Sequence, residues 1–226
     1  MVELSVIVPT KDEPSAPMII EELYKKLGND TEIIVVDKSD PETRKPLYST
    51  GAKIIVQKSS GYTAALMEGF REAHGDIIST IDPDGTYSVD DFKRVIGLLK
   101  NGTAGFASGD RSANKAVFGI HLRLGNAFLT GVFNLLYGQK MRDALSGSFA
   151  MKRNAFDLIR DVRPDSNKAG TLFFEAALAK RNQTFSQIPI SYAHRVGSKP
   201  KTSNFKPFLG VQIAFYTLKT RISKLE

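Results

Sequence analysis

Cysteine is absent from this chain of 226 residues, so disulfide bonds and thiolate metal sites are excluded. No uninterrupted apolar stretch approaches the roughly 20 residues that a membrane-spanning helix needs. No leader precedes the strand-like apolar run at 4–8. We therefore expect a protein without a signal peptide or transmembrane helix. It would be cytoplasmic, and able to lie on a membrane without crossing it.

Acidic residues are fewer than basic ones, 24 against 31, which gives a formal net charge of +7. The sequence pI is about 9.5. Such a balance favours polyanionic partners, whether nucleic acid, anionic lipid headgroups or phosphate-bearing small molecules, and does not choose among them. The hydrophobic share of 42% and the charged share of 24% are ordinary for a folded globular protein.

The first hundred residues alternate between short runs rich in Val and Ile and helical patterns. Strands are expected at 4–8, 32–37, 53–57 and 77–81, and helices at 18–27, 63–73 and 89–100. This alternation predicts an α/β domain with a mostly parallel, twisted sheet flanked by helices. Ligands bind such sheets beyond the carboxyl ends of the strands.

The second half of the chain is less regular. A polar stretch at 108–121 predicts a mobile loop, and Pro189 limits the run at 187–190 to an edge strand. The remaining elements are expected to be a strand at 148–151 and helices at 122–137, 154–159 and 171–180.

Acidic residues gather at the predicted strand ends, above all Asp82 and Asp84 after the fourth strand. Two carboxylates one residue apart at a strand end can both reach one hard cation, Mg²⁺ or Mn²⁺, which would bridge the diphosphate of a nucleotide. The alternative for an isolated pair of this kind is a solvated turn. No G-x-G-x-x-G follows the first strand, which argues against a Rossmann dehydrogenase.

Several motifs in the same order make residues 4–199 resemble glycosyltransferase family 2, of GT-A fold, in its dolichol-phosphate mannose/glucose synthase-like branch. They are V-I-V-P-T-x-D-E at 6–13, G-Y-T-A-A at 61–65, D-P-D-G-T-Y at 82–87, G-D-R at 109–111, R-D-x-x-S-G-S-F at 142–149, and I-P-I with R-x-G-S-K at 188–199. The resemblance implies a Rossmann-like nucleotide-sugar half at 1–105, an acceptor half at 106–204 and an appended helix at 205–226.

The resemblance also implies roles for individual residues. Asp82 and Asp84 would hold the metal, and Arg111 and Arg123 the acceptor phosphate. Asp143 would be a general base for a hydroxyl acceptor or, as we favour for a phosphate acceptor, the partner of an arginine. The donor would be bound by Pro9, Thr10, Glu13, Asp37, Arg195 and Lys199.

Two departures from the family pattern affect these roles. Lys38 stands where the family has a second acid that reads the base, so guanine and uracil both remain open. Asp110 replaces the usual Ser, which puts a negative charge beside a proposed phosphate ligand.

The C-terminal segment has an apolar period, at positions 208, 211, 215, 218, 222 and 225. This period predicts an amphipathic helix. The helix would pack on the core, lie in a membrane interface with its basic residues on anionic lipid, or mediate self-association.

Together these features predict an inverting, metal-dependent transfer of a hexose from a nucleotide sugar to a polyprenyl phosphate at the cytoplasmic membrane face. The donor would be of the GDP-mannose or UDP-glucose type, and nucleic acid is not an expected partner. Two alternatives remain: a saccharide hydroxyl as acceptor, and a catalytically silent nucleotide-binding protein.

Overall fold

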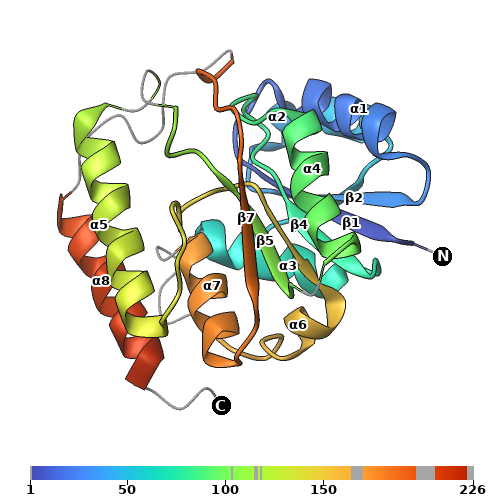
Figure 1. Ribbon diagram of the computed structural model, residues 1–226. Coiled ribbons are helices and arrows are strands. Elements are labelled where there is room, and N and C mark those ends of the chain that lie inside the picture. Colours follow the sequence, from blue (N-terminus) through green and yellow to red (C-terminus); the bar gives the residue numbers. More distant parts are fainter. Residues whose placement is uncertain are drawn as a thin grey trace.

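A computed structural model describes residues 2–102, 104–114, 117, 119–163, 170–196 and 207–222 (Figure 1). These residues form a seven-stranded sheet in the order β3-β2-β1-β4-β6-β5-β7. Its strands are β1 (Leu4–Thr10), β2 (Thr31–Asp37), β3 (Lys53–Val56), β4 (Ile77–Thr80), β5 (Phe106–Asp110), β6 (Phe149–Lys152) and β7 (Phe185–Pro189).

Strand direction places most strand ends at one edge of the sheet. β6 runs antiparallel to both of its neighbours, β4 and β5, whereas all other neighbouring strands pair in parallel. The carboxyl ends of every strand but β6 therefore lie at the same edge. Because β6 is reversed, the residues that lead into it reach this edge as well.

Helices cover both faces of the sheet. They are α1 (Ala16–Leu27), α2 (Pro41–Arg44), the 3-10 helix η1 (Lys45–Thr50), α3 (Tyr62–Glu72), α4 (Val89–Lys100), α5 (Ile120–Tyr137), α6 (Arg153–Asp157), α7 (Thr171–Lys180) and α8 (Pro207–Ile222). Local sequence sets several of their ends. Pro17 lies in the first turn of α1, and Gly28 ends that helix at a φ of 90°. Asp90 and Asp91 place negative charge in the first turn of α4.

Two apolar cores separate along the sheet because successive strand side chains point to opposite faces. Val6 and Val8 of β1 face α1 and α4, and this cluster includes the fully buried Phe92. Ile7 faces the opposite core, which α3, α5, α6 and α7 cover and in which Phe70 packs edge-on against Phe174. β1 is buried along its whole length, as expected for an interior parallel strand.

The predicted strands and helices of the first half are confirmed, whereas α2 and η1 were not predicted. The mobile loop predicted at 108–121 is wrong over Ser108–Asp110, which belongs to the buried strand β5. β5 escaped detection because the four residues that follow Phe106 in its sequence, F-A-S-G-D, are small or polar. Such residues suit a strand enclosed by β6 and β7, and Ile190 packs closely over Gly109.

The predicted C-terminal helix is present as α8, but it does not pack through the expected apolar stripe. It contacts α5 and α7 through a face that includes Ile213 and Thr217, which are buried. The described members of the stripe point outward instead, from Val211 (64% exposed) to Ile222 (77% exposed). Figure 1 shows α5 and α8 side by side on one flank of the molecule. No described helix is both long and apolar enough to cross a bilayer.

Candidate active site

A cleft of about 800 Å³ lies beyond the carboxyl ends of the parallel strands. The loops after β1, β2, β3, β4, β5 and β7 contribute to its wall. Its lining includes the predicted site residues Pro9, Thr10, Glu13, Asp82, Asp84, Arg111 and Arg195.

The D-P-D loop after β4 presents both of its carboxylates to this cleft. Tyr62 donates to Asp82 Oδ1 at 3.0 Å, and the backbone and hydroxyl of Thr86 donate to Asp84 Oδ1 at 3.1 and 2.6 Å. Burial, and next the charge of Asp84, raises the pKa of Asp82 to about 7. The two carboxylates therefore repel each other in a site that would stabilise a cation between them.

Gly147 supports this loop from behind. A Cβ atom at this position would lie 2.3 Å from Asp82 Oδ2, so only glycine lets the carboxylate approach the backbone so closely. The Gly147 amide donates to the Tyr87 hydroxyl at 2.7 Å, which fixes the turn that leads into β6. The reversed strand thus delivers a structural support to the aspartate pair.

The donor set fits a hard divalent cation. Asp82 and Asp84 supply carboxylate oxygens, the ligands that Mg²⁺ and Mn²⁺ prefer, and both line the cleft. No group of three or more His, Cys, Asp or Glu side chains suited to a metal occurs among the described residues. A site with so few protein ligands leaves coordination positions for phosphate oxygens and water, the usual arrangement for Mg²⁺ in nucleotide sites.

Arg195, from the segment after β7, lines the same cleft. It forms an ion pair with Glu13, and its Nη1 lies 3.7 Å from Asp84 Oδ2. The Ser15 hydroxyl oxygen lies 2.9 Å from Glu13 Oε1 and 2.8 Å from the Pro83 carbonyl, so its one hydrogen is donated between these two acceptors. One polar network therefore connects the loop after β1, the D-P-D loop after β4 and the segment after β7.

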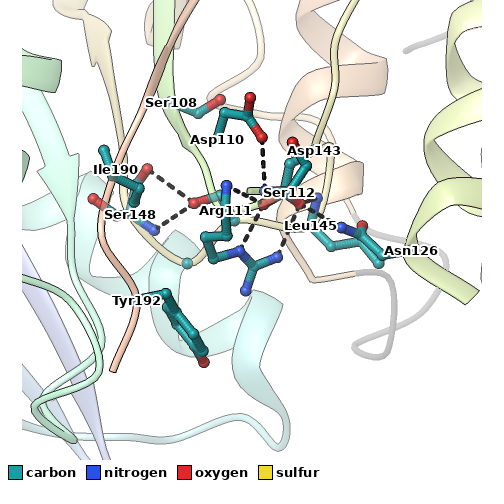
Figure 2. Close-up of polar contacts among 12 residues, drawn as sticks. Ser108, Asp110, Arg111, Ser112, Asn126, Asp143, Leu145, Ser148, Ile190 and Tyr192 are labelled. Atoms are coloured by element: carbon teal, nitrogen blue, oxygen red, sulfur yellow. Dashed lines mark hydrogen bonds and ion pairs between the residues drawn. The ribbon is translucent and has the colours of Figure 1, made fainter. Parts of the chain in front are cut away.

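Arg111 follows β5 at the same edge and is clamped by Asp143 (Figure 2). Its Nε and Nη2 donate to the two carboxylate oxygens at 2.7 and 2.9 Å, and the guanidinium lies 5.3 Å from the Tyr192 ring centroid. Burial alone would raise the pKa of Asp143, but the hydrogen bonds and charge of Arg111 hold it below the ordinary value. Asp143 is 0% exposed and does not line the cleft, so the geometry suits an anchor for Arg111 rather than a proton acceptor.

Besides Asp143, three predicted site residues lie apart from the cleft or outside the description. Asp37 is 0% exposed and bound to Arg44 and Ser39. Arg123 is exposed on the first turns of α5 and is not part of the cleft wall, although its neighbour Leu122 is. Lys199 lies outside the described residues.

Several residues that shape the site were not singled out from sequence. Tyr62 and Gly147 hold Asp82, while Tyr192 covers Arg111. Lys38 was noted as a departure and Gln57 was not considered, yet both line the cleft. Tyr62 and Gly147 fall inside the quoted motifs, but their partners are distant in sequence, so composition and spacing could not assign these contacts.

The fold matches that of GT-A glycosyltransferases. Glucosyl-3-phosphoglycerate synthase of Mycobacterium tuberculosis, solved with UDP, superposes with a TM-score of 0.74 at 19% identity, covering 97% of this chain and 80% of that one. The same enzyme with Mn²⁺, UDP and phosphoglyceric acid gives a TM-score of 0.72 at 18% identity, covering 98% and 79%. At this identity the likeness concerns the fold alone.

The chain itself belongs to glycosyl transferase family 2, whose profile matches residues 5–160. Its relatives include the low-salt glycan biosynthesis hexosyltransferase Agl6 of Haloferax volcanii, 28% identical across 86% of this chain and 48% of that protein. A dolichyl-phosphate hexose transferase of the same organism is 25% identical across 92% and 89%. The dolichol-phosphate mannosyltransferase of Pyrococcus furiosus is 24% identical across 88% and 59%. The chain thus spans about half the length of Agl6.

Proposed function

We propose that this chain transfers a hexose from a nucleoside diphosphate sugar to a polyprenyl phosphate at a membrane surface. One observation carries the proposal: a single cleft joins the carboxylates of Asp82 and Asp84 to the guanidinium groups of Arg111 and Arg195. Its wall continues at Leu122 into the exposed side of α5. The names of the relatives from Haloferax and Pyrococcus support a lipid-phosphate acceptor.

In this reaction an oxygen of the acceptor phosphate attacks the anomeric carbon of the sugar. The bond between that carbon and the donor diphosphate breaks, the configuration inverts, and the nucleoside diphosphate leaves. Mg²⁺ or Mn²⁺ held by Asp82 and Asp84 would neutralise the charge of the departing diphosphate. The attacking oxygen is already anionic, so no proton has to be removed. Asp143 can therefore remain paired with Arg111 throughout.

The cationic side chains then have to bring two phosphate-bearing groups together. Arg195, beside Glu13 and Asp84, would contact the donor diphosphate, and Arg111 would face the acceptor phosphate. The Asp143 clamp fixes the Arg111 guanidinium in one orientation before the acceptor arrives, which is the kind of preorganisation that lowers a barrier. On this view the strands β1–β4 serve the donor, and the later elements serve the acceptor.

The apolar residues on α5 and α8 suit contact with lipid. Exposed apolar side chains occur at Ile120, Leu122, Leu124, Phe128 and Leu135 of α5 and at Val211, Phe215, Leu218 and Ile222 of α8. Large exposed apolar patches mark interaction surfaces. Arg123 and Arg221, also exposed on these helices, would meet anionic headgroups. A polyprenyl chain could then stay in the bilayer while its phosphate enters the cleft.

Transfer from nucleotide sugars to vesicles that contain dolichyl phosphate tests this function. We expect Mn²⁺-dependent formation of a lipid-linked hexose, reduced at least about a hundredfold by Asp84→Asn. Asp90→Asn, at an exposed residue of α4 that pairs with Lys26, is the matched control. Equal transfer to dolichol without phosphate, or full activity with chelator, would overturn the proposal. Transfer to a saccharide hydroxyl would indicate the other acceptor class.

A further inference from the structure

Asp37, the acid that the family resemblance assigns to the nucleoside, is not available to a base. Its Oδ2 accepts from Arg44 Nε at 2.5 Å and from the Ser39 amide at 3.1 Å, and its Oδ1 accepts from the Ser39 hydroxyl at 2.6 Å. Arg44 also donates to the Ser39 carbonyl at 2.7 Å, so the guanidinium is held in place from two sides. The carboxylate is 0% exposed, and its charge is compensated within the loop after β2.

Lys38 and Gln57 line the cleft where Asp37 does not. The Lys38 backbone is fixed by a hydrogen bond to the Thr10 carbonyl at 2.9 Å, and its Nζ lies 3.4 Å from the Gln57 carbonyl. Gln57 donates from Nε2 to the Gly61 carbonyl at 2.9 Å, which orients its side-chain oxygen. Within the described part of the chain, nothing donates to that Oε1 atom. This wall therefore offers an ammonium donor beside an amide acceptor.

The position of these residues identifies the part of the donor that they would meet. The strand order is β3-β2-β1-β4, and Asp82 and Asp84 follow β4. With the diphosphate at the aspartates, the nucleoside extends over β1 toward the ends of β2 and β3, where Lys38 and Gln57 lie. Of the carboxylates in the cleft wall, Glu13 pairs with Arg195 and Asp84 lies 3.7 Å from it, and Asp82 belongs to the same D-P-D loop as Asp84, so all three lie at the diphosphate end. Among the described residues that line the cleft, none supplies a carboxylate at the base end.

We propose that Lys38 and Gln57 read the base in place of Asp37, and that the base is uracil. The proposal rests on the proposed use of a nucleotide sugar. Uracil presents a carbonyl oxygen next to an imide N–H, which match the Lys38 ammonium and the Gln57 oxygen. Guanine adds an amino group beside its N–H, and this pair of donors requires a second acceptor, such as the carboxylate that Arg44 encloses. Adenine and cytosine turn an amino group, rather than a carbonyl oxygen, toward the ammonium.

Calorimetric titration of the full chain with UDP, GDP and pyrophosphate, each with Mn²⁺, tests the assignment. We expect UDP to bind at least about tenfold more tightly than GDP. Lys38→Ala should weaken UDP about tenfold to a hundredfold, the range for a lost hydrogen bond to a charged group, and leave pyrophosphate unchanged. Lys45→Ala is the matched control, since Lys45 is exposed on the same segment and pairs with Glu42.

Arg44→Ala adds a second, opposite readout. Releasing Asp37 should narrow the preference for UDP over GDP, because a carboxylate becomes available to the guanine N–H groups. If this variant does not fold, the Lys38→Ala titrations decide alone. Tighter binding of GDP than UDP by the unaltered protein, or equal weakening of UDP and pyrophosphate by Lys38→Ala, overturns the base assignment and leaves the proposed transferase standing. Absence of Mn²⁺-dependent binding of all three ligands overturns both.

Discussion

Replacing Asp143 with asparagine separates its two possible roles, anchor and general base. The carboxylate accepts three hydrogen bonds from Arg111, from its backbone N, Nε and Nη2, and others from Asn126 and Leu145. Asparagine keeps one acceptor oxygen but turns an amide donor toward these donors, and it removes the negative charge that pairs with the buried Arg111 guanidinium. Breaking a buried pair from one side costs about 3–5 kcal/mol.

We take the lower end, about 3 kcal/mol, because one acceptor oxygen survives. For a chain of this size that loss lowers the Tm by about 6–12 °C. Asp157→Asn is the control, because Asp157 and Arg160 form an exposed pair at 3.9 Å. It should change stability by less than about 0.5 kcal/mol. Differential scanning fluorimetry and urea unfolding measure both variants.

The pH dependence of stability gives an independent check on the pair. The pKa of Asp143 is lowered in the folded state. Its contribution is therefore complete above the unfolded value, near 3.9, and is lost as the pH falls through the folded value. In Asp143→Asn the free energy of unfolding should fall less steeply at acidic pH than it does in the wild type. Below its own lowered Tm, the variant should keep measurable turnover with a raised requirement for lipid phosphate. Unchanged stability together with abolished turnover would refute the anchor role and indicate a general base.

Three further predictions concern the aspartate loop and the lipid surface. Gly147→Ala places a methyl group 2.3 Å from Asp82 Oδ2 and should weaken Mn²⁺ binding at least about tenfold, measured by isothermal titration. Gly97→Ala is the control, because open space surrounds Gly97, and it should leave Mn²⁺ binding unchanged. Because the pKa of Asp82 is raised to about 7, Mn²⁺ affinity should fall about tenfold per pH unit below that value; a flat profile from pH 5 to 7 would contradict this. Leu124→Glu with Phe215→Glu should reduce sedimentation with anionic vesicles and leave the Tm unchanged, because both side chains are exposed; unchanged sedimentation would count against the surface.

Sequence reasoning succeeded where one local rule determined the structure. Val- and Ile-rich runs at regular intervals revealed β1–β4, and the acidic motif after β4 was assigned to a strand end, where the structure has it. The rule failed at β5, whose small and polar residues are buried only because β6 and β7 enclose them. Without β5, Arg111 could be placed in a loop but not at the same sheet edge as Asp82.

Other misses have the same physical origin, since they depend on partners distant in sequence. The apolar stripe of α8 predicted which residues share a face, but not that α5 and α7 would contact the opposite face. Asp37 stands where the family resemblance puts a nucleoside ligand, yet Ser39 and Arg44, the latter on the unpredicted helix α2, occupy its carboxylate. A motif specifies residue types and spacing, whereas the availability of a side chain depends on its neighbours in space.

Replacing Arg195 should change the affinity for Mn²⁺ and the affinity for nucleoside diphosphate in opposite directions. Its guanidinium pairs with Glu13 and lies 3.7 Å from Asp84 Oδ2, so in the absence of nucleotide it partly neutralises the carboxylates that would hold the metal. Arg195→Ala should then tighten Mn²⁺ binding to the nucleotide-free protein by about fivefold, the equivalent of about 1 kcal/mol for a partly exposed pair. With Mn²⁺ present, the same change should weaken nucleoside diphosphate binding, because the diphosphate loses a cation. Arg94→Ala, at an exposed residue paired with Asp91 at 2.7 Å, should alter neither affinity. If Arg195→Ala weakened both ligands alike, the arginine would be holding the loop together rather than exchanging one anionic partner for another.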